Sequence, residues 1–207
     1  MTAMIGIKEF QKISEKLLIK IGAHKTVASD CTQVMLSASL RGIDTHGIEM
    51  LPKILTRVQD NRCRVDVPSK VKKADIAFSA VSIIDAKLAP GQHSCLVASR
   101  EAIKRANQYG IGFITVRNST HFGCCSPFLE KILEERMVGF VGSNNVCSMA
   151  AFGLEQPNIG NNPFGFAAPS QGNNDFIFDF SSAVMSYGRR IDYLASGKEL
   201  AEGSFIT

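Results

Sequence analysis

The chain has 207 residues, of which 45% are hydrophobic and 20% are charged, a composition that is typical of a globular protein and excludes disordered and collagen-like classes. Its net charge of +4 comes from basic residues scattered along the chain, so we expect no nucleic-acid partner. No apolar run approaches the roughly 18 residues of a membrane-spanning helix, and the N-terminus lacks a secretory pattern. We therefore expect no membrane partner and a cytoplasmic location.

Helical periodicity dominates the first part of the chain. Apolar residues at helical spacing predict three helices, over residues 7–21, 26–41 and 47–59. His46 directly precedes the third helix and is expected at its N-terminus. Met50 follows four residues later and is expected to share the face of His46. We interpret residues 1–60 as an N-terminal helical segment.

Beyond residue 60 the pattern changes to short strands that alternate with helices. The predicted elements are, in order, extended runs at 65–67 and 81–84, a helix over 91–108, a strand at 112–116, a helix over 125–136, and strands at 138–143 and 176–180. This order predicts an α/β fold with a mixed sheet that is at least partly parallel. The long loop 144–175 contains an apolar segment, residues 164–168, that we expect to pack against the protein, with a strand as one alternative. We interpret this loop as one wall of a site.

The sequence lacks the patterns of several common chemistries. No G-x-G-x-x-G follows a predicted strand, so there is no Rossmann fingerprint, and neither a P-loop nor a G-x-S-x-G elbow occurs. The four histidines lack the spacing of zinc ligands, so we expect no metal site. The six cysteines contain no C-x-x-C pair and are expected to be free thiols. Cys124 and Cys125 lie near His121, which suits either a cysteine nucleophile or close backbone packing.

Three polar residues stand at the ends of predicted elements. His46 precedes a helix, and His121 follows the strand 112–116. A histidine with an ordinary pKa near 6.5 can give or take a proton at neutral pH, so both are candidates for acid–base catalysis, the alternative being a structural role in a loop. Asp179 ends the strand 176–180, where it could orient a histidine, hold a ligand hydroxyl or cap the next segment.

Three segments resemble motifs of one known family. Residues 40–47, LRGIDTHG, resemble its (D/N)-S-H-G segment. Residues 116–123, VRNSTHFG, are similar to its V-R-N-S-x-H-F-G, and residues 160–169, GNNPFGFAAP, to its G-T-N-P-x-x-x-A-x-P. This is the malate/L-lactate dehydrogenase family with the non-Rossmann fold, which includes ureidoglycolate dehydrogenase, diketogulonate reductase, sulfolactate dehydrogenase and piperideine-carboxylate reductase. The three motifs stand in the family's order and span nearly the whole chain.

The resemblance implies a homodimeric enzyme that reduces a small-molecule substrate, a 2-oxo acid or a cyclic imino acid, with NAD or NADP as cofactor. Residues 61–207 would form the NAD(P)-binding α/β domain. His46, preceded by Thr45, resembles the family's acid–base histidine, and His121 matches a second histidine assigned either to catalysis or to the nicotinamide side. Asp179 matches a residue that touches the cofactor and supports the catalytic histidine. With His121 and Asp179, the residues implied to line the cofactor are Phe122, Gly123, Cys124, Cys125, Ser143, Asn162, Pro163, Phe164, Ser181, Ser182 and Ala183.

Three departures from the family pattern bear on activity. Thr45 replaces the usual serine, which keeps a hydroxyl and adds a methyl group that we expect to narrow the pocket. Met50 stands where the family often has an arginine that grips the substrate carboxylate. Family chains continue past Thr207 with a further segment that contacts the cofactor, so this chain resembles a C-terminally truncated member. The alternative to an active enzyme is a truncated or degenerate relative that acts as a subunit or interaction partner without turnover.

Overall fold

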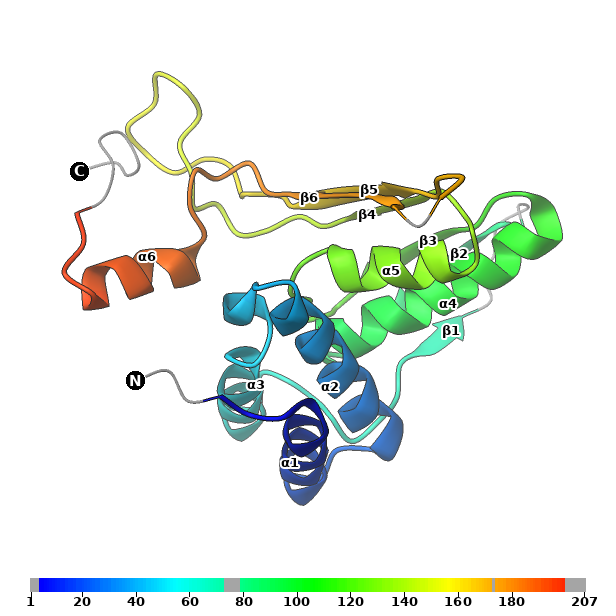
Figure 1. The fold of residues 1–207 in the computed structure, drawn as a ribbon, viewed down its shortest axis with the longest axis horizontal. Helices are drawn as coiled ribbons and strands as arrows, with labels where there is room; N and C mark the ends of the chain where they lie inside the picture. The colour runs from blue at the N-terminus through cyan, green and yellow to red at the C-terminus, as the bar shows by residue number, and fades with distance from the viewer. Residues whose placement is uncertain (1–3, 73–78, 173, 200–207) are drawn as a thin grey trace.

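The computed structural model describes residues 4–72, 79–172 and 174–199 (Figure 1). Its helices are α1 (Ile7–Lys20), α2 (Lys25–Leu40), α3 (Met50–Gln59), α4 (Gly91–Tyr109), α5 (Ser126–Glu134) and α6 (Tyr187–Ala195), and a 3-10 turn, η1, covers Asp44–His46. The strands are β1 (Lys70–Lys72), β2 (Val81–Asp85), β3 (Phe113–Arg117), β4 (Gly139–Gly142), β5 (Phe164–Ala168) and β6 (Phe176–Phe180). Among the described residues, no helix is both long and apolar enough to cross a membrane.

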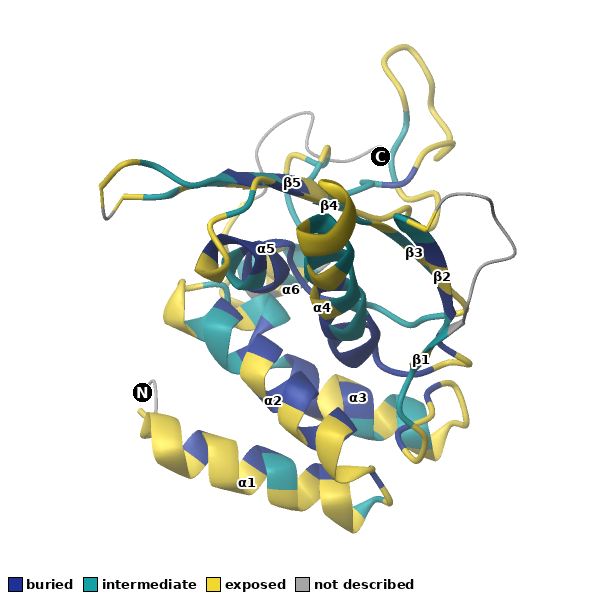
Figure 2. Cartoon of the chain, turned by 90° about the vertical axis from the view of Figure 1, so that its right-hand side faces the viewer, coloured by how far each residue is buried: buried dark blue, intermediate teal, exposed yellow. Residues whose placement is uncertain are grey.

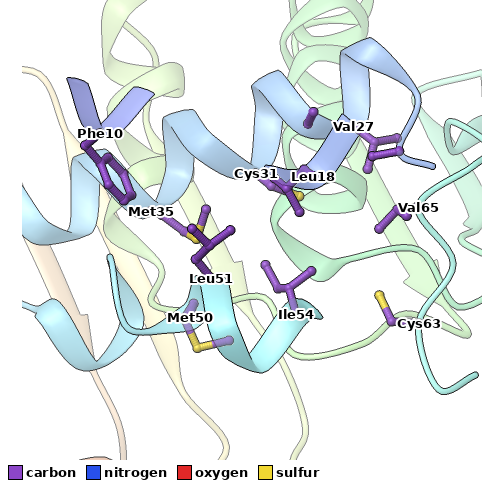
Figure 3. Packing of buried hydrophobic residues seen from close by; sticks show 12 residues of the cluster. Phe10, Leu18, Val27, Cys31, Met35, Met50, Leu51, Ile54, Cys63 and Val65 are labelled. Carbon is purple, nitrogen blue, oxygen red and sulfur yellow. The ribbon is translucent and has the colours of Figure 1, made fainter. Parts of the chain in front are cut away.

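The N-terminal helices pack around an apolar cluster (Figure 3). Phe10 and Leu18 of α1 meet Val27 and Met35 of α2, and α3 closes the cluster from the other side. The first two predicted helices are confirmed. The third begins at Met50 instead of residue 47, because the backbone of Gly47, at φ −100° and ψ −121°, lies outside the helical region and ends the 3-10 turn η1.

The first sheet has the strand order β1-β2-β3. Strands β2 and β3 are parallel and are joined through α4, which confirms the prediction of a partly parallel sheet. Strand β1 pairs with β2 in the antiparallel direction. The expected extended run at residues 65–67 forms no strand. Val65 is buried in the N-terminal cluster instead, and its carbonyl accepts a hydrogen bond from the backbone N–H of His24.

The second sheet has the order β4-β5-β6 and is antiparallel throughout. The apolar segment 164–168 of the predicted loop is its central strand, β5. Helix α5 covers one face of this sheet, and a Cβ atom on Gly165 would lie only 2.7 Å from the side chains of Cys125 and Leu129. The opposite face carries rings in mutual contact, with centroids 5.1 to 6.1 Å apart. This phenylalanine face consists of Phe140, Phe164, Phe166, Phe176, Phe178 and Phe180.

A buried polar cluster joins the N-terminal helices to the α/β part. The carboxylate of Asp30 on α2 lies 2.7 Å from Nδ1 of His93 and 2.6 Å from Nη2 of Arg100, both on α4. Burial alone would raise the pKa of Asp30, but the hydrogen bonds from His93 and Arg100 outweigh it and hold that pKa below its ordinary value. The N-terminal half of α4, α5 and the inner side of α2 form the most buried layer (Figure 2). A domain boundary at residue 60 stays a prediction.

Candidate active site

A cavity of about 970 Å³ lies where the ends of three strands meet. Its walls are residues 116–124, at the end of β3 and in the loop that follows it, residues 143–146 after β4, and residues 179–181 at the end of β6. Because β4 and β6 both run antiparallel to β5, their carboxyl ends share one edge of the sheet. The N-terminal segment adds His46 and Arg57 to the lining. Ligand pockets are typically roughly 300–1,000 Å³, so this cavity has the size of a ligand site.

The two candidate histidines stack against each other within this cavity. The ring centroids of His46 and His121 are 5.5 Å apart, with an angle of 26° between the planes. The hydroxyl of Thr45 lies 3.0 Å from Nδ1 of His46. The backbone N–H of Gly123 donates to Nδ1 of His121 over 3.2 Å. Since this nitrogen accepts a hydrogen bond, the neutral ring of His121 carries its proton on Nε2.

Both imidazoles are held in the neutral form. Burial lowers the pKa of His46, the positive charge of Lys53 lowers it further, and the carboxylate of Asp179 acts in the opposite direction. Burial, followed by the charges of His46, Arg57 and Lys53, lowers the pKa of His121 to about 4. Both rings are therefore proton acceptors at neutral pH, as a general base requires.

Asp179 is fixed by helix α5. Its Oδ2 atom accepts one hydrogen bond from the backbone N–H of Ser126, at 2.7 Å, and another from the Ser126 hydroxyl, at 2.8 Å. Asp179 therefore caps the N-terminus of α5 from a distant strand and does not cap the segment that follows it. The same side chain lines the cavity, where its charge favours protonation of His46.

Three asparagines, Asn145, Asn161 and Asn162, tie together the loops that follow β4 and precede β5. The Oδ1 atom of Asn162 accepts from the backbone N–H of Asn145 at 3.0 Å, and Nδ2 of Asn145 donates to Oδ1 of Asn161 at 2.7 Å. The backbone N–H of Ser182 donates to the carbonyl of Asn161. Asn144 and Asn145 both line the cavity. The predicted loop wall is therefore a cross-linked structure with amide groups facing the cavity.

Most of the sequence-predicted site residues meet at this cavity. The structure brings together His46, His121, Phe122, Gly123, Cys124, Ser143, Pro163, Asp179 and Ser181. The others lie outside the lining: Thr45, Cys125, Asn162, Phe164, Ser182 and Ala183. Phe164 belongs to the phenylalanine face, and Cys125 is buried beneath β5. The Thr45 methyl group was expected to narrow the pocket, but it lies against α6, where a Cβ atom on Gly188 would come within 3.1 Å of it.

The two adjacent cysteines are poor nucleophiles. Burial raises the pKa of the Cys124 thiol to about 11, and burial also raises the pKa of the Cys125 thiol far above its ordinary value. Thiols with such pKa values stay protonated at neutral pH, whereas nucleophilic cysteines act as thiolates. In the described part of the chain, no group of three or more His, Cys, Asp or Glu side chains is arranged to hold a metal ion.

The expected position of Met50 is wrong. Met50 is only 2% exposed and lies in the N-terminal apolar cluster (Figure 3), because η1 and Gly47 interrupt the helix on which residues 46 and 50 would have shared a face. Arg57, from the last turn of α3, lines the cavity instead and was missed. The spacing of the residues could have identified it. Met50, Ile54 and Arg57 stand at i, i+4 and i+7, so Arg57 is a charged residue on the face of the helix that is otherwise apolar. Asn144, Asn145 and Ser186 carried no comparable signal.

Comparison with known proteins places these observations in a family context. A model of the family described as Malate/L-lactate dehydrogenase matches residues 5–207. The L-sulfolactate dehydrogenase of Methanocaldococcus jannaschii is 28% identical over 196 residues, which cover 95% of this chain and 56% of that protein. The Delta(1)-pyrroline-2-carboxylate/Delta(1)-piperideine-2-carboxylate reductase of Pseudomonas putida is 26% identical over 199 residues, covering 96% of this chain and 58% of that protein.

A solved structure shows the same fold. The crystal structure of malate dehydrogenase from Entamoeba histolytica matches with a TM-score of 0.91 at 26% sequence identity, covering 98% of this chain and 55% of that one. The present chain therefore spans little more than half the length of the proteins that it resembles.

Proposed function

Because the chain belongs to the malate/L-lactate dehydrogenase family, we propose that it takes part in the reduction of a 2-oxo acid to a 2-hydroxy acid with NADH or NADPH. A cyclic imino acid is the other substrate type that the sequence resemblance includes. The observation that carries the proposal is the stacked pair of histidines in a cavity of ligand size. One of the two rings, His46, is oriented by a neighbouring hydroxyl.

The hydrogen-bonding side chains of the cavity lining suit a nicotinamide cofactor. Ribose hydroxyls, a pyrophosphate and a carboxamide need many hydrogen-bond partners, and the lining provides the side chains of Asn118, Asn144, Asn145, Ser119, Ser143 and Ser181. Gly123, with a φ of 97°, leaves the wall beside His46 without a side chain. We assign cofactor contacts to the lining residues Phe122, Gly123, Cys124, Ser143, Pro163 and Ser181. A bound nicotinamide would supply the hydride, which no side chain can provide.

His46 carries the proton transfer in this proposal. Its Nδ1 atom faces the Thr45 hydroxyl, so we assign the transfer to Nε2. The neutral ring accepts the hydroxyl proton when a 2-hydroxy acid is oxidised, and the protonated ring donates it back in the reducing direction. Asp179, held by Ser126, favours the protonated form through its charge. His121 stands beside His46 and is assigned to the nicotinamide side.

Turnover of NADH and NADPH tests the proposal. The chain is mixed with each cofactor and a panel of 2-oxo acids and cyclic imino acids, and the loss of reduced cofactor is followed by absorbance. His46→Gln should lower kcat by roughly two to four orders of magnitude and leave the Kd for the cofactor unchanged. His24→Gln is the control, because His24 caps α2 and lies outside the cavity lining. Near-normal turnover by His46→Gln would remove His46 from this role.

A second candidate function is a binding subunit without turnover. The observation that favours it is the burial of Met50: this residue stands where the resembled family often has an arginine that grips the substrate carboxylate, and its side chain is 2% exposed in the N-terminal apolar cluster. Cofactor binding without turnover on any substrate of the panel would support this candidate over the first. The homodimer and the cytoplasmic location stay predictions, and light scattering on the purified chain tests the former.

A further inference from the structure

Arg57 reaches the cavity along the buried side of α3. Met50 and Ile54, at i−7 and i−3 from it, are each 2% exposed and pack in the N-terminal cluster. Arg57 lies on the same stripe of the helix, is half-buried, and lines the cavity together with His46 and His121. Its charge helps to lower the pKa of His121, after the larger effects of burial and of His46. The positive charge of Arg57 therefore acts on His121 from the lining of the same cavity.

No carboxylate among the described residues pairs with this guanidinium. The other cations around the cavity are engaged: Arg117 pairs with Asp85 at 3.2 Å, and Lys53 lies 4.0 Å from Glu49. Arg57 has no ion pair or side-chain hydrogen bond within residues 4–72, 79–172 and 174–199. An arginine that is half removed from water and unpaired pays a desolvation cost that a bound anion would offset.

Arg57 and Asp179 are charged side chains that line the cavity beside the two histidines. Both histidines are neutral at pH 7 because their pKa values are lowered. Asp179 is the one acidic residue in the described lining, and its Oδ2 is committed to Ser126. A guanidinium presents five N–H donors in a planar fork that matches both oxygens of a carboxylate. The carboxylate of a ligand is therefore the chemical group that best matches the guanidinium of Arg57.

The geometry points to Arg57 as a carboxylate-binding subsite that takes the carboxylate of the 2-oxo or 2-hydroxy acid, with the neighbouring carbon and its oxygen placed at the histidine pair. This inference rests on the proposed function, because it names the part of the substrate that the same cavity recognises. It also replaces the expectation for position 50: Met50 is in the core, and the cation lies two helical turns further along α3.

Binding of oxamate, an unreactive isostere of a small 2-oxo acid, tests the subsite without turnover. Calorimetry on the 207-residue chain, with and without NADH, gives the Kd for the wild type, Arg57→Gln, Arg57→Lys and Arg62→Gln. We expect Arg57→Gln to weaken oxamate binding by roughly ten- to one-hundred-fold, the worth of a hydrogen-bonded charge pair. Arg57→Lys should recover part of this loss, because it restores the charge but not the fork.

Two controls isolate the carboxylate contact. Arg62→Gln removes the same charge from an exposed arginine that pairs with Asp60 at 2.6 Å, and its Kd for oxamate should equal that of the wild type. Oxamide, which lacks the carboxylate, should bind the wild type and Arg57→Gln equally weakly. A urea unfolding curve for Arg57→Gln shows whether the variant is folded, and the Arg57→Lys variant supplies the comparison if it is not.

The outcomes separate this inference from the proposed function. If oxamate binds Arg57→Gln as tightly as the wild type, or binds neither protein, the subsite is wrong, whether or not the chain oxidises NADH. If the wild type turns over no substrate while oxamate binding still depends on Arg57, the subsite stands and the proposed reaction fails. With an active wild type, Arg57→Gln should raise KM for 2-oxo acids by roughly tenfold or more and leave the Kd for the cofactor unchanged.

Discussion

Asp179, near the end of β6, and Ser126, the first residue of α5, are joined by two hydrogen bonds to a single carboxylate oxygen. The two residues are distant in sequence, and the contact fixes the start of α5 against the sheet edge that carries the cavity. Cys125, at the N-cap position of α5, makes no side-chain cap of its own. The carboxylate therefore satisfies a helix N-terminus that would otherwise lack a side-chain acceptor.

We predict that Asp179→Ala destabilises the protein by roughly 1–2 kcal/mol, the usual cost of removing a helix cap. The free energy of unfolding in urea, at pH 7, measures this change. Asp66→Ala is the matched control, because Asp66 is an exposed carboxylate that pairs with Arg64, and such surface pairs contribute roughly 0–1 kcal/mol. Equal losses in the two variants would contradict the capping role.

Helical periodicity predicted much of the fold. A helix that buries one face needs apolar residues at helical spacing, and this pattern can be recognised in the local sequence. Helices α1, α2, α4 and α5 begin and end within two residues of their expected positions. The antiparallel pairing of β4 with β5 joins strands on either side of the long segment 143–163, so no local pattern could have predicted it. No element was expected after residue 180, where the structure has α6.

The sequence predicted those residues of the candidate site whose side chains can themselves take part in proton transfer. His46 and His121 were identified as acid–base candidates from their places at element ends, and the structure stacks their rings. The misplacement of Met50 came from extending a helix through Gly47, whose backbone conformation depends on close packing against α2. Arg57 was missed because a cation near the end of an amphipathic helix is ordinarily a solvent-exposed residue.

The lowered pKa of His121 predicts a pH-dependent stability. Between about pH 4, its folded value, and about 6.5, its unfolded value, the unfolded chain binds a proton that the folded protein does not. The contribution of the neutral His121 ring to the free energy of unfolding is therefore fully present above about pH 6.5, and it is lost as the pH falls toward 4. We expect this histidine to account for a loss of roughly 2 kcal/mol between pH 7.5 and pH 5.0.

Urea unfolding of the wild type and of His121→Gln at these two pH values measures the effect. The variant should lose roughly 2 kcal/mol less than the wild type on acidification, while His46, whose pKa is lowered in the same direction, continues to contribute in both proteins. A parallel loss in the two proteins would show that His121 keeps its ordinary pKa. Comparing each protein with itself at pH 7.5 removes the effect of the substitution on packing.

Close packing at Gly47 predicts intolerance of any side chain. A Cβ atom there would overlap the Ser39 hydroxyl and lie 2.8 Å from the Ser39 backbone nitrogen and 2.9 Å from the Met35 carbonyl oxygen, all on α2. We expect Gly47→Ala to destabilise the fold by roughly 1–3 kcal/mol and to displace the turn that carries His46. Gly6→Ala is the control, because Gly6 has open space around it and a φ of −70°. Unfolding curves and the imidazole NMR signals of His46 report the two effects, and an unchanged curve would refute the packing argument.

The buried position of Met50 predicts a large loss of stability for one substitution and a small loss for another. Met50→Arg would place an unpaired guanidinium in the apolar cluster of α1, α2 and α3, which should cost roughly 3–5 kcal/mol and lower the Tm. Met50→Leu, of similar volume, should cost less than about 1.5 kcal/mol. Thermal and urea unfolding compare the two variants. If Met50→Arg is as stable as Met50→Leu and binds oxamate more tightly than the wild type, residue 50 faces the cavity and not the apolar cluster.

The cavity draws its lining from Ile43 to Ser186, so nearly the whole described chain must fold before it exists. Contacts of such high sequence separation form late and slow the folding of a domain, and no partially folded state that lacks the second sheet can present both the histidines and the amide wall. Ligand affinity and global stability are consequently linked. A ligand present at one hundred times its Kd should raise the free energy of unfolding by roughly 2.7 kcal/mol, so thermal shift with NADH, NADPH and oxamate can rank ligands even if no reaction is observed.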